Sequence, residues 1–482
     1  MPERLPRVAW FAPLPTADDL LAALGTAWPI DRFVDETPTQ VRVAGERARV
    51  LPAREFRRLD RRTRYDAVVY QLGNHPAYGY CYRQALERPG AIVLRHTFLH
   101  DLVLSVMVER REFSGYRTLM ERRYGAPGRE MAGRVLLGQH PLSVFAFPLI
   151  ENVVEAAEQL VVQSRAAQDN VTARHPRARV RLIPLGVRLP PAIDRRAARA
   201  PLALPADEFL LVSLAPADRR RRLDVVLDTV ARLRRELPVR LVLAGPVDPD
   251  LPLESLIGAA GLDGVAEAWG AVDRCTGSRL HAAADACLYL RSPWIGESSV
   301  SLLRALGAGR AAVVSDTGWF AELPNDAVAK VAVDVLEDET LCSLLRTFAA
   351  EPELAQAVGH RARAYVARAH SLQQMVAGFH QLLQELTGVE LPPHGLPGVS
   401  LEVTAPNDVP ARSPDPLLDD VGAALAELGI GGGRWAREAA RAAVELGLGS
   451  ENDGANVQEE RDGERGEADQ RGAARDPGLP GL

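Results

Sequence analysis

The stretch that decides the fold covers residues 290–318 and reads LRSPWIGESSVSLLRALGAGRAAVVSDTG. The apolar run 286–290 just before it predicts a buried strand, and the apolar residues of 300–306 have the spacing of a helix. A second apolar run, 311–315, predicts another buried strand after the helix. The stretch is therefore predicted to be a βαβ unit, whose crossover is almost always right-handed.

The loop between the first strand and the helix carries Glu297, Ser298, Ser299 and Ser301. In such a unit ligands bind beyond the carboxyl ends of the strands, where free N–H groups and the helix dipole favour phosphate. We expect a phosphate-bearing ligand on the serine turn, with Glu297 beside it for a neutral, hydroxyl-rich group. From these residues alone, an ordinary βαβ unit with a well-capped helix is the equal alternative.

Length and composition limit the class of protein. A chain of 482 residues with 47% hydrophobic residues predicts two or three globular domains. The net charge of −6 argues against a general nucleic-acid binder. No signal peptide or apolar run of about 20 residues is visible. The widely spaced Cys81, Cys275, Cys287 and Cys342 predict reduced thiols, so we expect a soluble, cytoplasmic protein.

Strand and helix patterns alternate along two successive parts of the chain, which predicts two doubly wound α/β halves with parallel sheets. A Pro- and Ala-rich stretch separates them, and Pro-rich and then strongly polar stretches end the chain. We expect a first domain over 1–188, a linker over 189–205, a second domain over 206–368, a long amphipathic helix over 369–388, a second linker over 389–415, a short helical segment over 416–448 and a disordered tail over 449–482.

Two strand ends in the first half carry polar residues. The strands predicted over 65–74 and 91–94 place Asn74, His75, His96, His100 and Asp101 near one edge of one sheet. Histidines gathered at strand ends are a candidate site. The alternative is that they only form hydrogen bonds with the backbone.

Four arginines, 219–222, follow a strand and open a helix in the second half. The always-charged guanidinium fork suits phosphate, and Arg221 is expected near the serine turn. A solvated face remains the alternative for Arg219 and Arg220. The chain has no Walker loop, no Gly-x-Gly-x-x-Gly after a strand and no nucleophile elbow, which argues against a nucleoside triphosphatase and an ordinary NAD enzyme.

Several segments, in order and spacing, resemble the family 4 retaining glycosyltransferases of the GT-B fold. They are YDAVVYQLGN (65–74), IPLGV (183–187), RRLDVV (221–226), LAG (243–245), AAAD (282–285) and the opening stretch. The resemblance covers roughly residues 7 to 388. It implies two Rossmann-like domains facing a cleft and a final helix that crosses back to the first domain.

The resemblance also implies an activity: an enzyme that transfers a sugar from a nucleotide-sugar donor, with retention, to an acceptor that is a glycan, a lipid or a small molecule. It implies no metal and no separate cofactor. We expect catalysis by Glu297 and His100, donor binding by Arg221, Arg222, Gly245, Ser298, Ser299, Ser301 and Arg304, and acceptor contacts from Asn74, His75, His96 and Asp101. A contact between the basic helical residues 110–123 and a membrane surface stays open.

The chain departs from the family pattern at its paired glutamates, which lie eight positions apart. Arg304 occupies the second position, and counting back eight reaches Gly296, so that Glu297 is offset by one. A catalytically silent GT-B module that binds a nucleotide-sugar or a protein is therefore an alternative. A hydrolase or epimerase acting on a sugar nucleotide is a weaker one.

Overall fold

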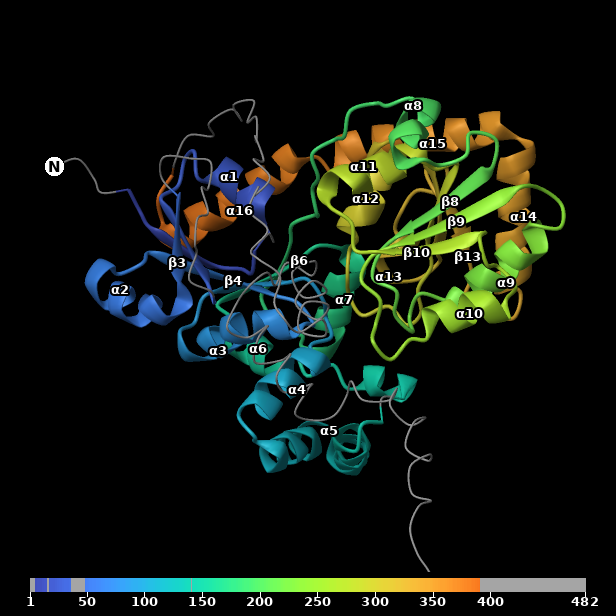
Figure 1. Ribbon diagram of the computed structural model, residues 1–482. Helices are drawn as coiled ribbons and strands as arrows, with labels where there is room; N and C mark the ends of the chain where they lie inside the picture. Colours follow the sequence, from blue (N-terminus) through green and yellow to red (C-terminus); the bar gives the residue numbers. More distant parts are fainter. Residues whose placement is uncertain (1–4, 15–16, 36–47, 140, 391–482) are drawn as a thin grey trace, which may run out of the picture.

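The computed structural model describes residues 5–14, 17–35, 48–139 and 141–390, and the predictions for 391–482 lie outside the described residues. Within these ranges the chain forms two parallel sheets, each covered by helices on both faces (Figure 1). The first sheet has the order β3-β2-β1-β4-β5-β6-β7 and the second β10-β9-β8-β11-β12-β13. The α/β class with two Rossmann-like domains, expected from the sequence, is confirmed.

The strands of the first sheet are β1 (Val8–Phe11), β2 (Ile30–Val34), β3 (Ala48–Pro52), β4 (Ala67–Leu72), β5 (Ala91–Leu94), β6 (Gln159–Val162) and β7 (Val180–Leu182). Those of the second are β8 (Phe209–Leu214), β9 (Val239–Ala244), β10 (Ala266–Gly270), β11 (Ala286–Tyr289), β12 (Ala311–Ser315) and β13 (Ala329–Val331). Most strands are buried on both faces, which is why they read as continuous apolar runs.

The helices of the first part are α1 (Asp18–Leu24), α2 (Phe56–Thr63), α3 (Gly79–Glu87), α4 (His100–Glu109), α5 (Phe113–Leu136), α6 (Glu151–Ala156) and α7 (Arg165–Arg174). Those that follow are α8 (Arg195–Arg199), α9 (Leu223–Leu233), α10 (Leu253–Ala259), α11 (Arg274–Ala283), α12 (Val300–Gly307), α13 (Gly318–Ala321), α14 (Glu337–Ala350), α15 (Pro352–Ala369) and α16 (Leu372–Thr387).

The helix α5 is kinked at Gly125, where φ is 66°, two residues before Pro127. Two further details differ from the sequence-based expectations. The edge strand β3 has no counterpart among the predicted strands. The stretch expected to be a bare linker contains α8, whose Arg199 is buried and bonds the carboxylate of Asp285 at 2.5 Å.

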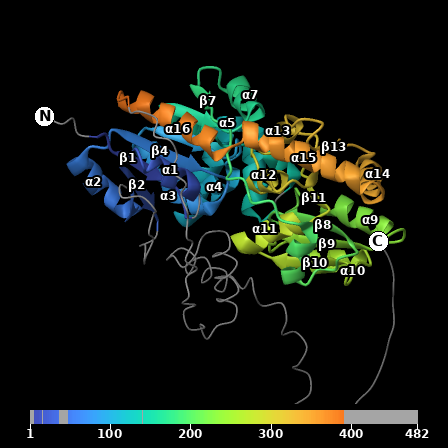
Figure 2. The same cartoon turned by 90° about the horizontal axis from the view of Figure 1, so that it is seen from above.

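The last helix returns to the first domain. Figures 1 and 2 show α16 lying across the first sheet, far from the strands that precede it in the chain. Phe379 packs on Trp10 with ring centroids 5.5 Å apart, and the indole nitrogen of Trp28 donates to His380 at 3.0 Å. One apolar cluster runs from this helix through β1 and β4 to α12 and β12, so that the two domains share a core.

Candidate functional site

The strand order of the second sheet reverses between β8 and β11, which lie side by side. In doubly wound sheets ligands bind outside the carboxyl ends of the strands at this point. The loop after β8 contains the four arginines, and the loop after β11 leads into α12. The site is therefore built from residues 215–222 and 290–301.

The N-terminus of α12 carries the predicted serine turn. The Oγ of Ser299 caps the helix by accepting from the backbone N–H of Leu302 at 3.1 Å. This leaves the N–H groups of Val300 and Ser301, which a helix start does not bond internally. The Oγ of Ser298 is buried and has no hydrogen-bond partner among the described residues. Three polar groups at the helix start are thus suited to an anion.

Ser301 has a different environment. Its Oγ donates to the carbonyl of Leu214 at 2.6 Å and lies 2.8 Å from the hydroxyl of Tyr289, which in turn is 2.9 Å from His281. The side chain therefore attaches α12 to β8 and β11. Its backbone N–H, rather than its hydroxyl, is therefore the group left to bind a ligand at the helix start.

Glu297 is the centre of a buried ionic cluster. One carboxylate oxygen accepts from Arg291 and, at 3.0 Å, from Arg220, and the other accepts from the backbone N–H of Ile295 at 2.9 Å. Burial alone would raise the pKa of Glu297, but Arg291 and Arg220 hold it well below the ordinary value. Glu297 is therefore an ionised carboxylate with both oxygens occupied.

Arg291 was not among the predicted site residues, and for Arg220 a solvated face was the alternative. The structure places both in the cluster, with side-chain exposures of 4% and 16%. Arg291 also lies 4.7 Å from the ring centre of Phe320. Arg221 was identified because its arginine run follows a strand and opens a helix, and Arg291, two residues after the end of β11, also follows a strand.

Arg221 is the cation without a full set of partners. Its Nε donates to the carbonyl of Pro216 at 2.9 Å, but its buried Nη1 has no partner among the described residues. Burial and then repulsion from Arg291 and Arg220 lower the pKa of Arg221 to about 9, although Asp218 opposes this. A bound anion would offset both the cost of burying the charge of Arg221 and its repulsion from the other two arginines.

Arg222 and Gly245 have structural environments. Arg222 bonds the buried carboxylate of Glu337 at 2.6 Å, which argues against the predicted donor contact. A Cβ at Gly245 would lie 2.3 Å from the carbonyl oxygen of Ala215, and φ there is 143°. The glycine therefore lets the loops after β8 and β9 approach each other closely.

Arg304 lies in α12, one turn beyond Val300, and its side chain has no hydrogen bond or ion pair among the described residues. Burial and the neighbouring Arg274 lower its pKa. After Arg221 it is a second cation with unbonded donors among the described residues, and it lies in the last turn of α12.

On the first-domain side, Asn74 organises the candidate acceptor residues. Its Oδ1 accepts from the backbone N–H groups of Asp101 and Leu102 at 2.9 and 3.2 Å, and its Nδ2 donates to Asp101 at 2.6 Å. It thereby caps α4, whose own N-cap, Leu99, has no side-chain cap. Its N–H donates to Nδ1 of His96 at 3.1 Å, which assigns the proton of the neutral ring to Nε2.

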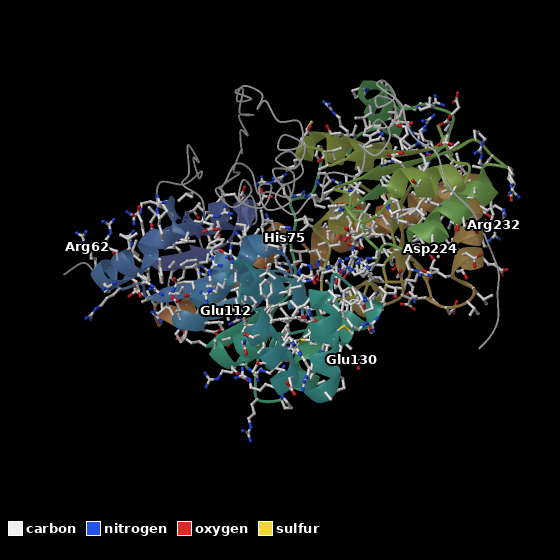
Figure 3. The ribbon with its side chains drawn as sticks, turned by 60° about the horizontal axis from the view of Figure 1, so that its bottom comes forward. Arg62, His75, Glu112, Glu130, Asp224 and Arg232 are labelled. Carbon is white, nitrogen blue, oxygen red and sulfur yellow. The ribbon has the colours of Figure 1, made fainter. Side chains whose placement is uncertain are left out.

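The two remaining histidines do not join this group as expected. His75 accepts from the N–H of Ala77 at 3.1 Å and caps a short 3₁₀ helix, and Figure 3 shows it on the first domain toward its boundary with the second. His100 is fully buried, with Nδ1 2.8 Å from the carbonyl of Phe147 and Nε2 2.6 Å from the hydroxyl of Tyr116. This placement argues against the predicted catalytic role of His100, because neither ring nitrogen is accessible.

The two domains meet at the cluster. The N–H of Thr97 donates to the carbonyl of Ile295 at 2.9 Å, and Glu297 interacts electrostatically with His96. Arg274 bonds Asp19 of the first domain at 2.9 Å. Within the described ranges no group of three or more metal-ligating side chains is found.

Known proteins resemble this chain in its second domain and in its fold. Residues 194–365 match the family model described as Glycosyl transferases group 1, which spans the second sheet. No curated protein matches the chain.

Solved structures match nearly the whole described chain. Sucrose-phosphate synthase from Thermosynechococcus elongatus is 17% identical, with a TM-score of 0.58 over 80% of this chain and 99% of that one. HepE of Anabaena, solved with UDP-glucose, is 14% identical with a TM-score of 0.56 over 79% and 99% of the chains. WaaG, a glycosyltransferase involved in lipopolysaccharide biosynthesis, is 14% identical with a TM-score of 0.54 over 79% and 100%. At such identities the likeness concerns the fold. The chain thus has the GT-B fold, with a second domain that matches the group 1 glycosyltransferases, and together these findings support a transferase enzyme.

Proposed function

We propose that this protein is a retaining glycosyltransferase that moves a sugar from a nucleotide-sugar donor to an acceptor that is a glycan, a lipid or a small molecule. The observation that carries the proposal is the pair of unpartnered buried atoms, Nη1 of Arg221 and Oγ of Ser298, beside the N-terminus of α12. Both are hydrogen-bond donors at the point of the sheet where ligands bind, and a diphosphate would satisfy both.

The proposed catalysis is electrostatic. As the bond between sugar and diphosphate breaks, negative charge grows on the departing phosphate oxygens. Donors held in place beforehand stabilise that charge without having to reorganise. Arg221 and the N–H groups of Val300 and Ser301 would do this, while Glu297 would hold Arg220 and Arg291 in position. Because both oxygens of Glu297 are engaged, we propose that it acts as a positioning residue and does not attack the sugar.

We propose that the acceptor binds on the first-domain side, at Asn74, His96 and Asp101. With the proton of His96 on Nε2, this ring offers a hydrogen-bond donor toward the ionic cluster. No metal or separate cofactor is part of the proposal, because the cations of the cluster supply the positive charge that the diphosphate needs.

The test is calorimetric titration with UDP-, GDP- and ADP-sugars, followed by an assay for nucleotide release. Arg221→Ala is expected to weaken donor binding about tenfold or more, the scale of a lost charge-assisted hydrogen bond. The control is Arg232→Ala on α9, an exposed arginine bonded to Asp338 at 3.0 Å and labelled in Figure 3. If Arg221→Ala and the control bind the donor equally, the assignment of Arg221 is wrong.

The second candidate is a module that binds a nucleotide-sugar without transferring the sugar. Gly296 and Arg304 favour it, because neither can supply the carboxylates found at these positions in the family. Tight binding without nucleotide release, with every acceptor offered, would decide for this alternative. Release that disappears in Glu297→Ala would decide for the enzyme.

We further propose a cytoplasmic protein with a peripheral membrane contact. All four cysteines are free and Cys275 is exposed, which suits a reducing compartment. No helix in the described part of the chain is long and apolar enough to cross a membrane. Val108 and Phe113, 43% and 47% exposed, flank two arginines where α4 meets α5, a segment marked by Glu112 in Figure 3. Co-sedimentation with anionic vesicles, lost in Phe113→Asp, tests the contact.

A further inference from the structure

A pocket lies at the edge of the second sheet where its parallel strands begin. Phe209 starts β8, Asp285 directly precedes β11 and Arg310 directly precedes β12, and all three line the pocket. Its other walls come from α8, the end of α14 and the first turn of α15, and Figure 1 shows α8 and α15 beside each other. Its free volume, counted with the open solvent at its mouth, is about 390 Å³. The candidate site lies at the opposite edge, where β8 and β11 end, so this pocket is separate from it.

Arg310 brings a positive charge without a bonded counter-charge to this pocket. Its Nη2 donates to the carbonyl of Ile193 at 3.0 Å, and its buried Nε has no hydrogen-bond partner among the described residues. Burial of the side chain lowers the pKa of Arg310. A carbonyl oxygen is neutral, so an anion beside the guanidinium would offset the cost of burying its charge.

The acidic side chain that lines the pocket, Asp285, is already engaged by other groups. Its Oδ1 accepts from Arg195. Its Oδ2 accepts from Arg199 at 2.5 Å and from the backbone N–H of Leu210 at 2.7 Å. The single negative charge of Asp285 is thus shared between two arginines, and Arg310 adds a third positive charge. This group of side chains therefore has an excess of positive charge, which favours an anionic ligand.

The rest of the lining limits the kind of anion. Phe209, Ala311 and Phe348 contribute apolar walls, and Gln356 is the one further polar side chain among the lining residues. Such walls suit a ligand with an apolar body and a single charged group. A phosphate monoester carries nearly two negative charges at neutral pH. A carboxylate carries one, and its two oxygens match the planar fork of one guanidinium.

We propose that this pocket binds a small organic carboxylate, with the carboxylate group at Arg310 and the apolar body against Phe209 and Phe348. The pocket is bordered by both segments of the chain that join the domains. Arg195 belongs to the stretch between β7 and β8, and Pro352 begins the helix that leads into α16. A ligand there would contact both connections. The site is independent of the proposed sugar transfer, because it shares no residue with the candidate site.

The experiment is calorimetric titration of the full chain with benzoate as the probe. The wild type is expected to bind benzoate at least about tenfold more tightly than the neutral benzamide, and inorganic phosphate should not displace the benzoate. Arg310→Gln is expected to weaken benzoate binding by about tenfold or more, because it removes the charge that pairs with the carboxylate. Ala349→Leu, which narrows the pocket and keeps Arg310, should also weaken it and serves if Arg310→Gln folds poorly.

Two further variants locate the probe. Arg361→Gln is the matched control, because Arg361 also donates to a backbone carbonyl, that of Asp326 at 2.8 Å, and does not line the pocket. It should leave the affinity for benzoate within about twofold, and so should Arg221→Ala. Loss of binding in Arg221→Ala would place benzoate in the candidate site and overturn the proposal. The proposal is also wrong if the wild type does not bind benzoate, if benzamide binds equally well, if phosphate displaces benzoate, or if Arg310→Gln binds it as tightly as the wild type.

Discussion

The backbone N–H of Thr97 donates a 2.9 Å hydrogen bond to the carbonyl of Ile295, joining the loop after β5 of the first domain to the loop after β11 of the second. The next residue, Gly296, has a φ of 92°, and a Cβ there would lie 2.2 Å from Oγ1 and 2.3 Å from the backbone nitrogen of Thr97. The two loops can approach this closely because residue 296 has no side chain. The glycine at this position of the resembled glutamate pattern thus has a steric reason in this chain.

We expect Gly296→Ala to destabilise the protein by about 2 kcal/mol or more, from backbone strain and the clash with Thr97. Donor binding should weaken with it, and Gly296→Glu, which places a larger side chain against Thr97, should be worse. Chemical denaturation measures the first effect. Gly133→Ala is the control, since nothing lies within 4 Å of its added Cβ. A neutral Gly296→Ala would show that the two loops are free to separate.

Glu297→Gln is expected to lower the free energy of unfolding by about 3–5 kcal/mol, because it leaves Arg220 and Arg291 as uncompensated buried charges. The pKa of Glu297 is lowered relative to 4.5, so the unfolded chain binds the proton more readily. The ionised Glu297 therefore stabilises the fold fully at pH values above 4.5, and this stabilisation is lost as the pH falls below 4.5. Denaturation at several pH values should show this loss in the wild type and a smaller one in the variant. Glu236→Gln, in an exposed pair with Arg346, should change little.

His96 is expected to stay neutral throughout the physiological pH range, because burial lowers its pKa to about 3 despite the nearby Glu297. The unfolded chain protonates this ring near 6.5, so its contribution makes the protein less stable as pH falls from about 6.5 toward 3. Nitrogen NMR of the imidazole should find the proton on Nε2 at pH 6. A ring that titrates near 6.5 in the folded protein would contradict the assignment.

Tyr116→Phe tests whether His100 is structural. The substitution removes the hydroxyl 2.6 Å from Nε2 of His100 and leaves a buried ring nitrogen unpaired, at a cost of about 1–3 kcal/mol. Donor affinity and turnover measured well below the melting temperature should stay within about twofold of the wild type. A large loss of turnover without a loss of stability would restore His100 to the catalytic group.

Much of the fold could be predicted because each local pattern agreed with its final environment. Buried parallel strands read as apolar runs, and the helix after the serine turn is capped by Ser299, whose Oγ accepts from the N–H of Leu302 at 3.1 Å. The strand β3 was missed because its short sequence, ARVLP, contains an arginine and a proline, which an edge position tolerates. The helix α8 was missed because one of its buried residues is an arginine. Arg199 is buried there by pairing with Asp285, a residue 86 positions away that no local pattern reveals.

The sequence by itself determined the two α/β halves and the helix that begins at the serine turn, because these depend on periodicity and on residues within one loop. Only the tertiary structure decided which polar groups are paired and which are left unsatisfied. Glu297 is bonded by Arg220 and Arg291 and His100 by Tyr116, while Nη1 of Arg221 and Oγ of Ser298 have no partner among the described residues. The physical reason is that pairing of buried charges depends on which strand ends meet, and residues from two domains meet here through contacts that no local pattern records.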